Sequence, residues 1–171
     1  MLRGQCRGKT DLPHEVWAYI AGFLDGDGCI MAQLVRRNGY RLGFQVRASI
    51  VFYQHQSHKE ILFWLKGQLG YGYIRDRNDA MCEYTIVGLR EVEEVLTSLA
   101  PYLRVKKQLA NAVLEIIKLH PSRMTPDELL LLSEKVDATA RFNYSKRRSN
   151  TYTRVNDFLR LAGLVPVETE G

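Results

Sequence analysis

Two aspartates stand close together near the start of the chain, each followed by a glycine, in the run Asp25-Gly26-Asp27-Gly28. Mg²⁺ in proteins is bound by one or two carboxylates and keeps several waters, so this spacing fits a metal site. Asp-Gly pairs are also common turn formers. An EF-hand is excluded, because the fifth and twelfth positions counted from Asp25 are Cys29 and Arg36. The run therefore indicates either an ordinary turn or a metal site built on Asp27.

The residues before these aspartates predict a helix. Residues 17–24 are mostly apolar, small or aromatic, and the glycines that follow favour a helix end near Asp25. A helix C-terminus disfavours each carboxylate by about 0.3–1 kcal/mol, which a bound cation would offset. Small side chains also permit a second helix to pack closely against this one. The expected contact residues are Ala18, Ala21, Gly22 and Asp25.

The composition limits the class of protein. A chain of 171 residues is long enough for one domain with a buried core, and its net charge of +5 favours nucleic acid or an anionic membrane surface. No apolar run approaches 18 residues and no signal-peptide core is visible. Cys6, Cys29 and Cys82 are widely spaced, without a C-x-x-C pair. We expect neither a disulfide framework nor a zinc site, and a reducing intracellular compartment.

Hydrophobic periodicity predicts an α+β chain. Strands are expected at 29–37 and 40–53, joined by a turn at Asn38-Gly39, and again at 71–77 and 82–88. Five further helices are expected at 57–69, with Trp64 on the inward stripe, and at 89–99, 104–119, 126–141 and 151–162. The order is an αββαββα core plus C-terminal helices. We expect one domain over residues 13–165, a flexible basic arm at 1–12 and a tail at 166–171.

Alternation along the strands separates an apolar face from a polar face. The polar face carries arginine and glutamine, the side chains that read guanine and adenine in the major groove. For Arg75 and Arg77, a solvated face paired with nearby acidic residues is an equal alternative. Arg104, Lys106 and Lys107 open a helix at the end that disfavours cations, which indicates an external anion that attracts them.

Three segments together resemble one known family. Residues 19–28, Y-I-A-G-F-L-D-G-D-G, look like the defining motif of the LAGLIDADG homing endonucleases. The stretches Y-G-Y-I-R-D-R at 71–77 and P-Y-L-R-V-K-K-Q at 101–108 extend the likeness over about residues 15–150. One motif in the chain resembles the members that act as homodimers. The resemblance implies a four-stranded antiparallel, saddle-like sheet with helices packed on one face.

The resemblance also implies an activity. It is the site-specific cutting of both strands of a long pseudo-palindromic DNA target by metal-dependent phosphodiester hydrolysis. Mg²⁺ is the expected cofactor, and Mn²⁺ or Ca²⁺ would occupy the same sites. The gene would lie in a mobile group I intron of a chloroplast or mitochondrion, and the expected partners are double-stranded DNA and a second copy of the chain, with no membrane.

Several residues match positions with known roles in that family. Asp27 would bind the metal with help from the Gly26 carbonyl, while Asp25 would cap the helix crossing or contact a nearby water. Gln54 would orient water, and Lys106 would either stabilise developing negative charge or tune the nucleophile. His58 stands where some relatives carry arginine, and it would donate a hydrogen bond only when charged or in the right tautomer.

The polar face and one basic loop are expected to contact DNA. Apolar side chains there would meet thymine methyl groups, and the loop would meet phosphates. The expected set is Met31, Gln33, Val35, Tyr40, Gln45, Arg47, Ser49, Val51, Tyr73, Arg75, Arg77, Glu83, Thr85, Ser145, Lys146 and Arg147.

Two other functions stay open. The family includes maturases, so the chain could be an intron-RNA splicing factor or a non-catalytic DNA-binding protein. Intact Asp27, Gln54 and Lys106 favour the nuclease. A basic dimeric domain for a protein or membrane surface is a third hypothesis, which the alternation of basic residues along strands disfavours.

Overall fold

The computed structural model describes residues 11–143 and 148–166. Most of the expected arm and tail, and the loop residues Ser145, Lys146 and Arg147, lie outside the described residues. The order of elements confirms the α+β pattern. They are α1 (His14–Asp27), β1 (Gly28–Arg36), β2 (Phe44–His55), η1 (Gln56–His58), α2 (Glu60–Leu69), β3 (Tyr73–Asp76), β4 (Met81–Val87), α3 (Leu89–Leu99), α4 (Lys107–Leu119), α5 (Pro126–Ala138), η2 (Thr139–Phe142) and α6 (Tyr152–Leu161).

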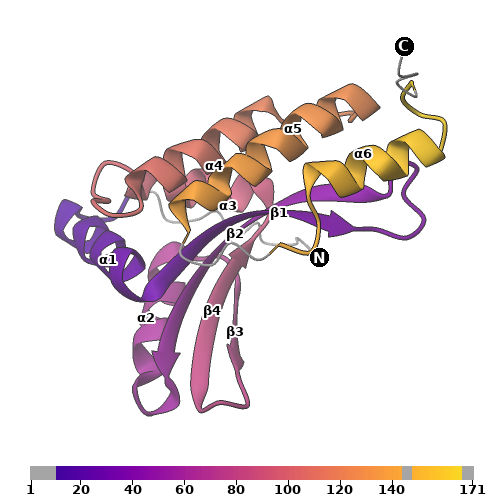
Figure 1. Ribbon diagram of the computed structural model, residues 1–171. Helices are drawn as coiled ribbons and strands as arrows, with labels where there is room; N and C mark the ends of the chain where they lie inside the picture. The colour runs from indigo at the N-terminus through magenta and orange to yellow at the C-terminus, as the bar shows by residue number, and fades with distance from the viewer. Residues whose placement is uncertain (1–10, 144–147, 167–171) are drawn as a thin grey trace, which may run out of the picture.

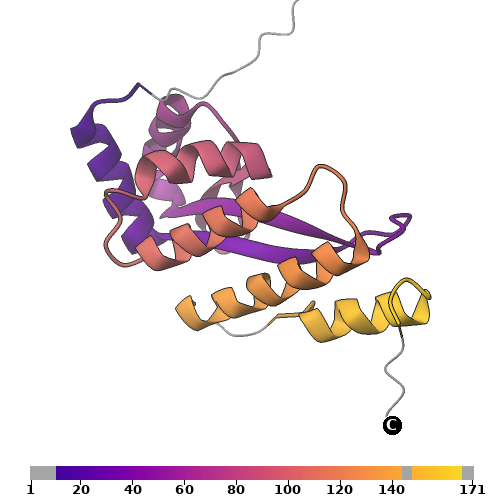
Figure 2. The same cartoon turned by 90° about the horizontal axis from the view of Figure 1, so that it is seen from above.

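Four antiparallel strands form one sheet in the order β1-β2-β4-β3. β1 pairs with β2 over its whole length, from Gly28 opposite Phe52 to Arg36 opposite Phe44. The helices lie on one side of this sheet, and the strands curve away beneath them (Figure 1). Seen from above, α4 and α5 run side by side over β1 and β2, and α6 follows α5 (Figure 2). In the described part of the chain, the opposite face of the sheet carries no helix, as the resemblance implies.

Alternation along the strands separates the two faces as the sequence predicts. Ile30, Ile50 and Ile86 stand opposite one another on β1, β2 and β4, and all three are fully buried. Two residues along, on the same face, the rings of Phe52 and Tyr84 stack with their centroids 5.7 Å apart. The even-numbered side chains of these strands therefore pack against the helices, and the odd-numbered ones point to the other face.

α1 is longer than predicted. It contains Gly26 and ends at Asp27, and the chain becomes extended at Gly28, with φ −119° and ψ 172°. The predicted stop near Asp25 rests on the low helix propensity of glycine, which is about 1 kcal/mol per residue. Contacts from the start of α4, described below, outweigh that local preference.

The first hairpin has a longer loop than the Asn38-Gly39 signal predicts. Residues 37–43 form a loop in which the Arg37 N–H donates to the Gly43 carbonyl and the Gly43 N–H donates to the Tyr40 carbonyl, both at 2.9 Å. Gly43 has a φ of 70°, so the chain needs a left-handed position four residues after Gly39, outside the two residues of the predicted turn. Tyr40, expected at the start of the second strand, therefore lies exposed in the loop.

Among residues 11–143 and 148–166, no helix combines the length and the hydropathy required to cross a membrane. The helices instead use their apolar faces within the core. α3, for example, buries Val92, Val95, Leu96 and Leu99.

A pair of glycine substitutions tests the packing of the second hairpin. Gly72 has a φ of 77°, and a Cβ there would collide with the Thr85 carbonyl of β4. We expect Gly72→Ala to lower the free energy of unfolding by more than about 1–2 kcal/mol, the usual cost of a left-handed non-glycine residue. Gly67 lies within α2 with no atom within 4 Å of an added Cβ, so Gly67→Ala should raise it by about 0.5–1 kcal/mol. Urea unfolding of both variants measures this, and equal effects would contradict the register.

Candidate active site

The carboxylate of Asp25 binds the chain segment that leads into α4. Its Oδ2 accepts the backbone N–H groups of Arg104 and Val105 at 2.7 and 3.1 Å, and its Oδ1 accepts that of Lys106 at 2.9 Å. These three N–H groups would otherwise be free ahead of the first turn of the helix. Asp25 therefore caps the crossing of α1 and α4, as expected, and α4 begins at Lys107 instead of residue 104.

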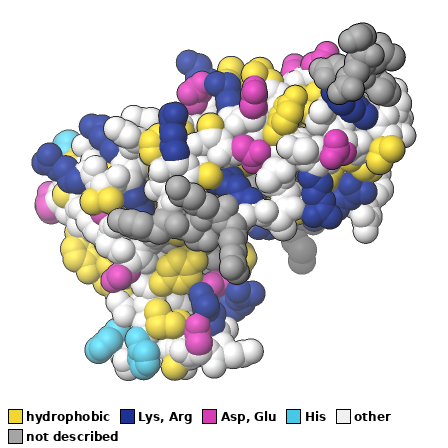
Figure 3. Space-filling model, in the orientation of Figure 1, with side chains coloured by type: hydrophobic (Ala, Val, Ile, Leu, Met, Phe, Trp, Pro, Cys, Tyr) yellow, Lys and Arg dark blue, Asp and Glu magenta, His cyan; other side chains and the backbone are white. Residues whose placement is uncertain are grey.

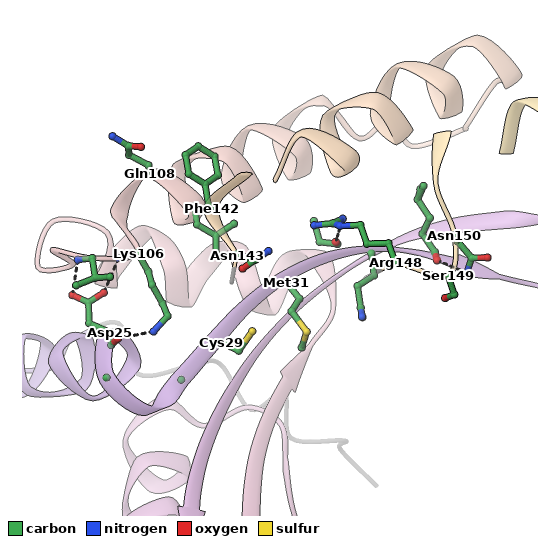
Figure 4. A pocket seen from close by; sticks show the side chains of 17 residues that line it. Asp25, Cys29, Met31, Lys106, Gln108, Phe142, Asn143, Arg148, Ser149 and Asn150 are labelled. Atoms are coloured by element: carbon green, nitrogen blue, oxygen red, sulfur yellow. Dashed lines mark hydrogen bonds between the residues drawn. The ribbon is translucent and has the colours of Figure 1, made fainter. Parts of the chain in front are cut away.

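The Lys106 side chain makes the reverse connection. Its Nζ donates to the carbonyls of Leu24 and Asp25, at 2.8 and 2.6 Å, in the last turn of α1 (Figure 4). The Asp25 carboxylate thus lies at the N-terminus of α4 and the Lys106 ammonium at the C-terminus of α1. These are the helix ends that attract a negative and a positive charge, respectively. The anion that the sequence predicts near these cations is in part internal, because it is Asp25. We call this pair of connections the α1–α4 clamp.

The pKa shifts follow from the clamp. Burial alone would raise the pKa of Asp25, but the three N–H donors and the Lys106 charge outweigh it, so the pKa lies below its usual 3.8. Burial lowers the pKa of Lys106, and the charges of Asp25, Cys29 and Asp27 oppose that shift. Lys106 therefore lies in the field of both aspartates of the motif.

Asp27 differs from Asp25 in having no partner. It is exposed at the end of α1, and no hydrogen bond or ion pair engages its carboxylate within the described residues. The carbonyl of Gly26 belongs to the last turn, which has no intrahelical donors, and no atom lies within 4 Å of an added Cβ at Gly26. An exposed, unpaired carboxylate beside a free carbonyl is a suitable pair of oxygen ligands for Mg²⁺.

These two oxygens alone would be an incomplete set of ligands for a metal ion. Within residues 11–143 and 148–166, no group of three histidine, cysteine or acidic side chains is placed to hold a metal ion. Mg²⁺ keeps several waters and takes few protein ligands, so the donor set fits that ion if further oxygens come from water, a substrate or a second chain.

Gln54 and His58 lie at the same end of the sheet as Asp27 but do not join the clamp. Gln54 is two residues beyond Phe52, which pairs with Gly28, and its side-chain carbonyl accepts the His55 N–H at 2.9 Å. His58 is exposed in η1. No hydrogen bond links either side chain to Asp27 or Lys106, so the catalytic roles expected of them stay predictions.

The strand register places almost all of the expected DNA-contact residues of the sheet on the face that carries no helix. Gln33 pairs with Arg47, Met31 with Ser49, and Tyr73 with Thr85. Tyr40 lies apart in its loop, and Arg77 follows β3. In the single chain, four members of the set are at most about a tenth exposed, namely Ser49, Val51, Glu83 and Thr85. They lie on the two central strands, between flanking side chains, and present little surface for direct contact.

The polar side chains of this face are already paired with one another. Arg47 donates to the Gln33 side chain at 2.7 Å, and Arg37 donates to that of Gln45 at 3.0 Å. Figure 3 shows lysine and arginine side chains along the hollowed lower right of the view, with acidic side chains among them. The face is therefore an ordered array of donors and acceptors.

Glu83 holds two arginines at once. Its carboxylate lies 2.7 Å from the Arg75 guanidinium and 3.9 Å from that of Arg77, and Arg77 also lies 2.9 Å from Asp79. The Arg75 side chain is 65% exposed while that of Glu83 is 11% exposed. The two alternatives for Arg75 and Arg77 are therefore compatible, because both arginines are paired with acidic residues and still point to open space.

One of the four expected dimer-contact residues is corrected because it has no exposed surface, and the contacts expected of the other three stay predictions. Ala21 is fully buried in the core, and both carboxylate oxygens of Asp25 bond within the chain. Ala18 and Gly22 are exposed as expected. Because α1 extends to Asp27, the exposed small residues recur every four positions, so Gly26 joins them in place of Ala21.

The sequence did not indicate how the C-terminal segment contacts β1. The Arg148 guanidinium donates to the Val136 carbonyl at 2.9 Å and the Thr139 hydroxyl at 2.8 Å, and the Asn150 amide donates to the Leu34 carbonyl at 2.8 Å. Arg148 therefore points inward. A groove of about 660 Å³ runs from Lys106 along β1 to this segment (Figure 4). The Asn150–Leu34 bond joins residues 116 positions apart, and a contact of that kind leaves no periodic signal in a sequence.

Comparisons with known proteins agree with this geometry. The family model of the LAGLIDADG endonucleases matches residues 20–118. DNA endonuclease I-CvuI of Chlorella vulgaris is 37% identical over 149 residues, which is 87% of this chain and 92% of that protein. DNA endonuclease I-CreI of Chlamydomonas reinhardtii is 35% identical over 152 residues, covering 88% and 93%. An uncharacterised 50.9 kDa protein in ND4 intron 1 of Podospora anserina is 26% identical over 86 residues, 49% of this chain and 19% of that one.

A solved structure extends the likeness to the fold. The crystal structure of I-CvuI in complex with its target, in the presence of Ca, superposes with a TM-score of 0.85 at 36% identity, over 89% of this chain and 97% of that one. The residues matched by the family model, 20–118, contain the motif of α1, the four strands and the start of α4. The chain belongs to the LAGLIDADG endonuclease family.

Proposed function

We propose that the chain is a homing endonuclease that hydrolyses both strands of one long DNA target as a homodimer. The observation that carries the proposal is the state of Asp27, an exposed carboxylate left unpaired at the end of a helix that the α1–α4 clamp fixes. It lies at the edge of a face that carries paired arginine and glutamine side chains. The names of the relatives I-CvuI and I-CreI support the same reaction.

Asp27 and the Gly26 carbonyl would hold Mg²⁺. When bound, the ion supplies an activated water and compensates charge on the phosphate oxygens. The chain's own residues orient the site. Asp25 and Lys106 fix the last turn of α1, and the Lys106 charge lies close enough to offset negative charge that develops there.

The number of unpaired carboxylates that each chain offers favours a homodimer. Each chain offers one unpaired carboxylate of the motif, whereas cutting a duplex requires two phosphates to be hydrolysed. Two copies related by a two-fold axis present the same surface twice, so the target would contain two similar half-sites. Gln33, Arg47 and Arg75 would read base edges within each half-site.

The cellular setting is also part of the proposal. We infer a gene within a mobile group I intron of a chloroplast or mitochondrial genome. The Podospora relative, named for an intron, supports an intron location.

Replacing Asp27 tests the proposal. Asp27→Asn should abolish cutting of a randomised duplex library in Mg²⁺ while its DNA affinity in Ca²⁺ stays within about tenfold, because the change removes a ligand and no packing contact. Asp11→Asn, which removes an exposed charge elsewhere, should cut as the native protein does. Cleavage by Asp27→Asn would contradict the metal-ligand role. Salt-sensitive DNA binding without any cutting by the native protein would instead favour the splicing factor, with intron RNA as the next ligand.

A second prediction concerns the two arginines held by Glu83. Glu83→Gln removes the carboxylate that orients them, so we expect stronger binding to unrelated DNA and a preference for the target that falls by about 1–3 kcal/mol, the discrimination of one good base contact. Glu93→Gln removes the same charge from an exposed position of α3 and serves as the control. Competition binding against unrelated duplex gives the preference. If both variants keep it, Glu83 does not position the arginines.

A further inference from the structure

An arginine at the end of β1 lies against two aromatic rings. The Cζ atom of Arg36 is 4.9 Å from the centroid of the Phe44 ring and 4.2 Å from that of the Phe158 ring. The two rings meet edge to face, with their centroids 5.7 Å apart. Phe44 is the partner of Arg36 in the first hairpin, whereas Phe158 belongs to α6. Because a guanidinium is attracted to the face of an aromatic ring, this cluster joins the C-terminal helix to the end of the sheet.

Phe158 also packs against the loop of the first hairpin. Gly43 is buried with a φ of 70°, and a Cβ there would collide with the Phe158 ring. The ring therefore occupies the space that a side chain would fill, and glycine permits this close approach. Figures 1 and 2 show α6 at the hairpin end of β1 and β2. The helix thus supports the loop formed by residues 37–43.

α6 is itself fixed to the body of the protein. Val155 and Leu159 are fully buried on its inner face. At the start of the helix, the Tyr152 N–H donates to the Asp137 carboxylate of α5 at 2.8 Å. Phe158 therefore projects from an anchored helix, and its ring can hold the loop in one position.

The supported loop orients a side chain on the face of the sheet that carries no helix. The Gly43 carbonyl accepts the Arg37 N–H at 2.9 Å, and the Arg37 side chain donates to the Gln45 amide oxygen at 3.0 Å. This bond leaves the NH2 group of Gln45 to donate, for example to a base acceptor in the major groove. Successive contacts thus connect Phe158 of α6 to Gln45, one of the expected DNA-contact residues.

We propose that Phe158 and Arg36 are positioning residues, which hold the loop at 37–43 and thereby set the base preference of Gln45. Both lie on the side of the sheet that carries the helices, so they act through the loop and not by touching a base. A side chain that is already ordered loses less freedom when it binds, so an oriented Gln45 discriminates better between bases. The inference rests on the proposed function, because a base preference requires a DNA target.

The test is the base preference of binding, obtained by selecting bound sequences from a randomised duplex library in Ca²⁺. Gln45→Ala marks the base pairs that Gln45 reads, where discrimination should fall at least about fivefold. Phe158→Ala should lower discrimination at the same base pairs at least about threefold and leave the rest of the target as in the native protein. Val155→Ala removes packing from the same helix but leaves the Phe158 ring, so it should lower the melting temperature and keep the preference. An unchanged preference in Phe158→Ala, or an equal loss in Val155→Ala, would overturn the proposal.

Arg36 has a matched control in the same hairpin. Arg36→Gln and Arg41→Gln each remove one positive charge, and Arg41 is exposed in the loop. Both variants should bind DNA more weakly at low salt, because each loses a charge that attracts phosphate. Only Arg36→Gln should lower discrimination at the base pairs marked by Gln45→Ala. The same preference in both variants would overturn the role of Arg36.

Amide hydrogen exchange of the DNA-free protein separates this proposal from the endonuclease proposal. The Arg37 and Gly43 N–H groups donate to carbonyls within the loop, so their exchange rates report whether the loop is held. Phe158→Ala should raise both rates at least about tenfold, and Val155→Ala should not. Unchanged rates in Phe158→Ala would overturn this proposal and leave the endonuclease intact. A native protein that binds DNA with a base preference but cuts none would end the endonuclease proposal and leave this one intact.

Discussion

The exchange of charges between α1 and α4 is the interaction on which the rest of the site depends. A carboxylate near the C-terminus of one helix and an ammonium near the N-terminus of another are each unfavourable alone, because both meet helix ends of like sign. Where the two helices cross, both interactions become favourable, because Asp25 accepts hydrogen bonds from three N–H groups and Lys106 donates to two carbonyls. The last turn of α1 is therefore fixed by contacts nearly 80 residues away in the chain, and Asp27 is left as the one motif carboxylate free to bind a cation.

The same helix end joins the chemistry to the sheet. α1 runs directly into β1 at Gly28, and β1 lies at the edge of the sheet beside β2. A position fixed at the end of α1 is thus fixed relative to the register that places Gln33, Arg47 and Arg75 on one face. Two-residue periodicity keeps the core on the opposite face, so recognition and stability use different side chains of the same strands. This arrangement lets one short motif fix the packing of α1, the position of the proposed metal site and the start of the face that we propose reads DNA.

Much of this could be predicted from the sequence. Strong period-two alternation identified the face that carries Gln33 and Arg47, and the residues around Asp27 identified the motif. Local signals failed where distant contacts decide the outcome. The low helix propensity of glycine predicted that α1 ends too early, because propensity takes no account of the distant contact with Lys106. The Asn38-Gly39 signal did not predict the left-handed position at Gly43. Helical periodicity wrongly predicted that Trp64 is buried. Ala21 was wrongly expected on the exposed surface of α1 because a small side chain fits a buried helix face as well as an exposed one, and it packs in the core.

The most direct test is the Mg²⁺ dependence of DNA cutting by Asp25→Asn, measured together with its melting temperature. If Asp25 positions the site without binding the metal, losing the charged cap costs about 1–2 kcal/mol, which for a chain of this size lowers the melting temperature by about 2–8 °C. Cutting should then need more Mg²⁺ for half its maximal rate but recover at saturating Mg²⁺. A variant that melts as the native protein does and cuts at no Mg²⁺ concentration would make Asp25 a metal ligand and contradict the clamp.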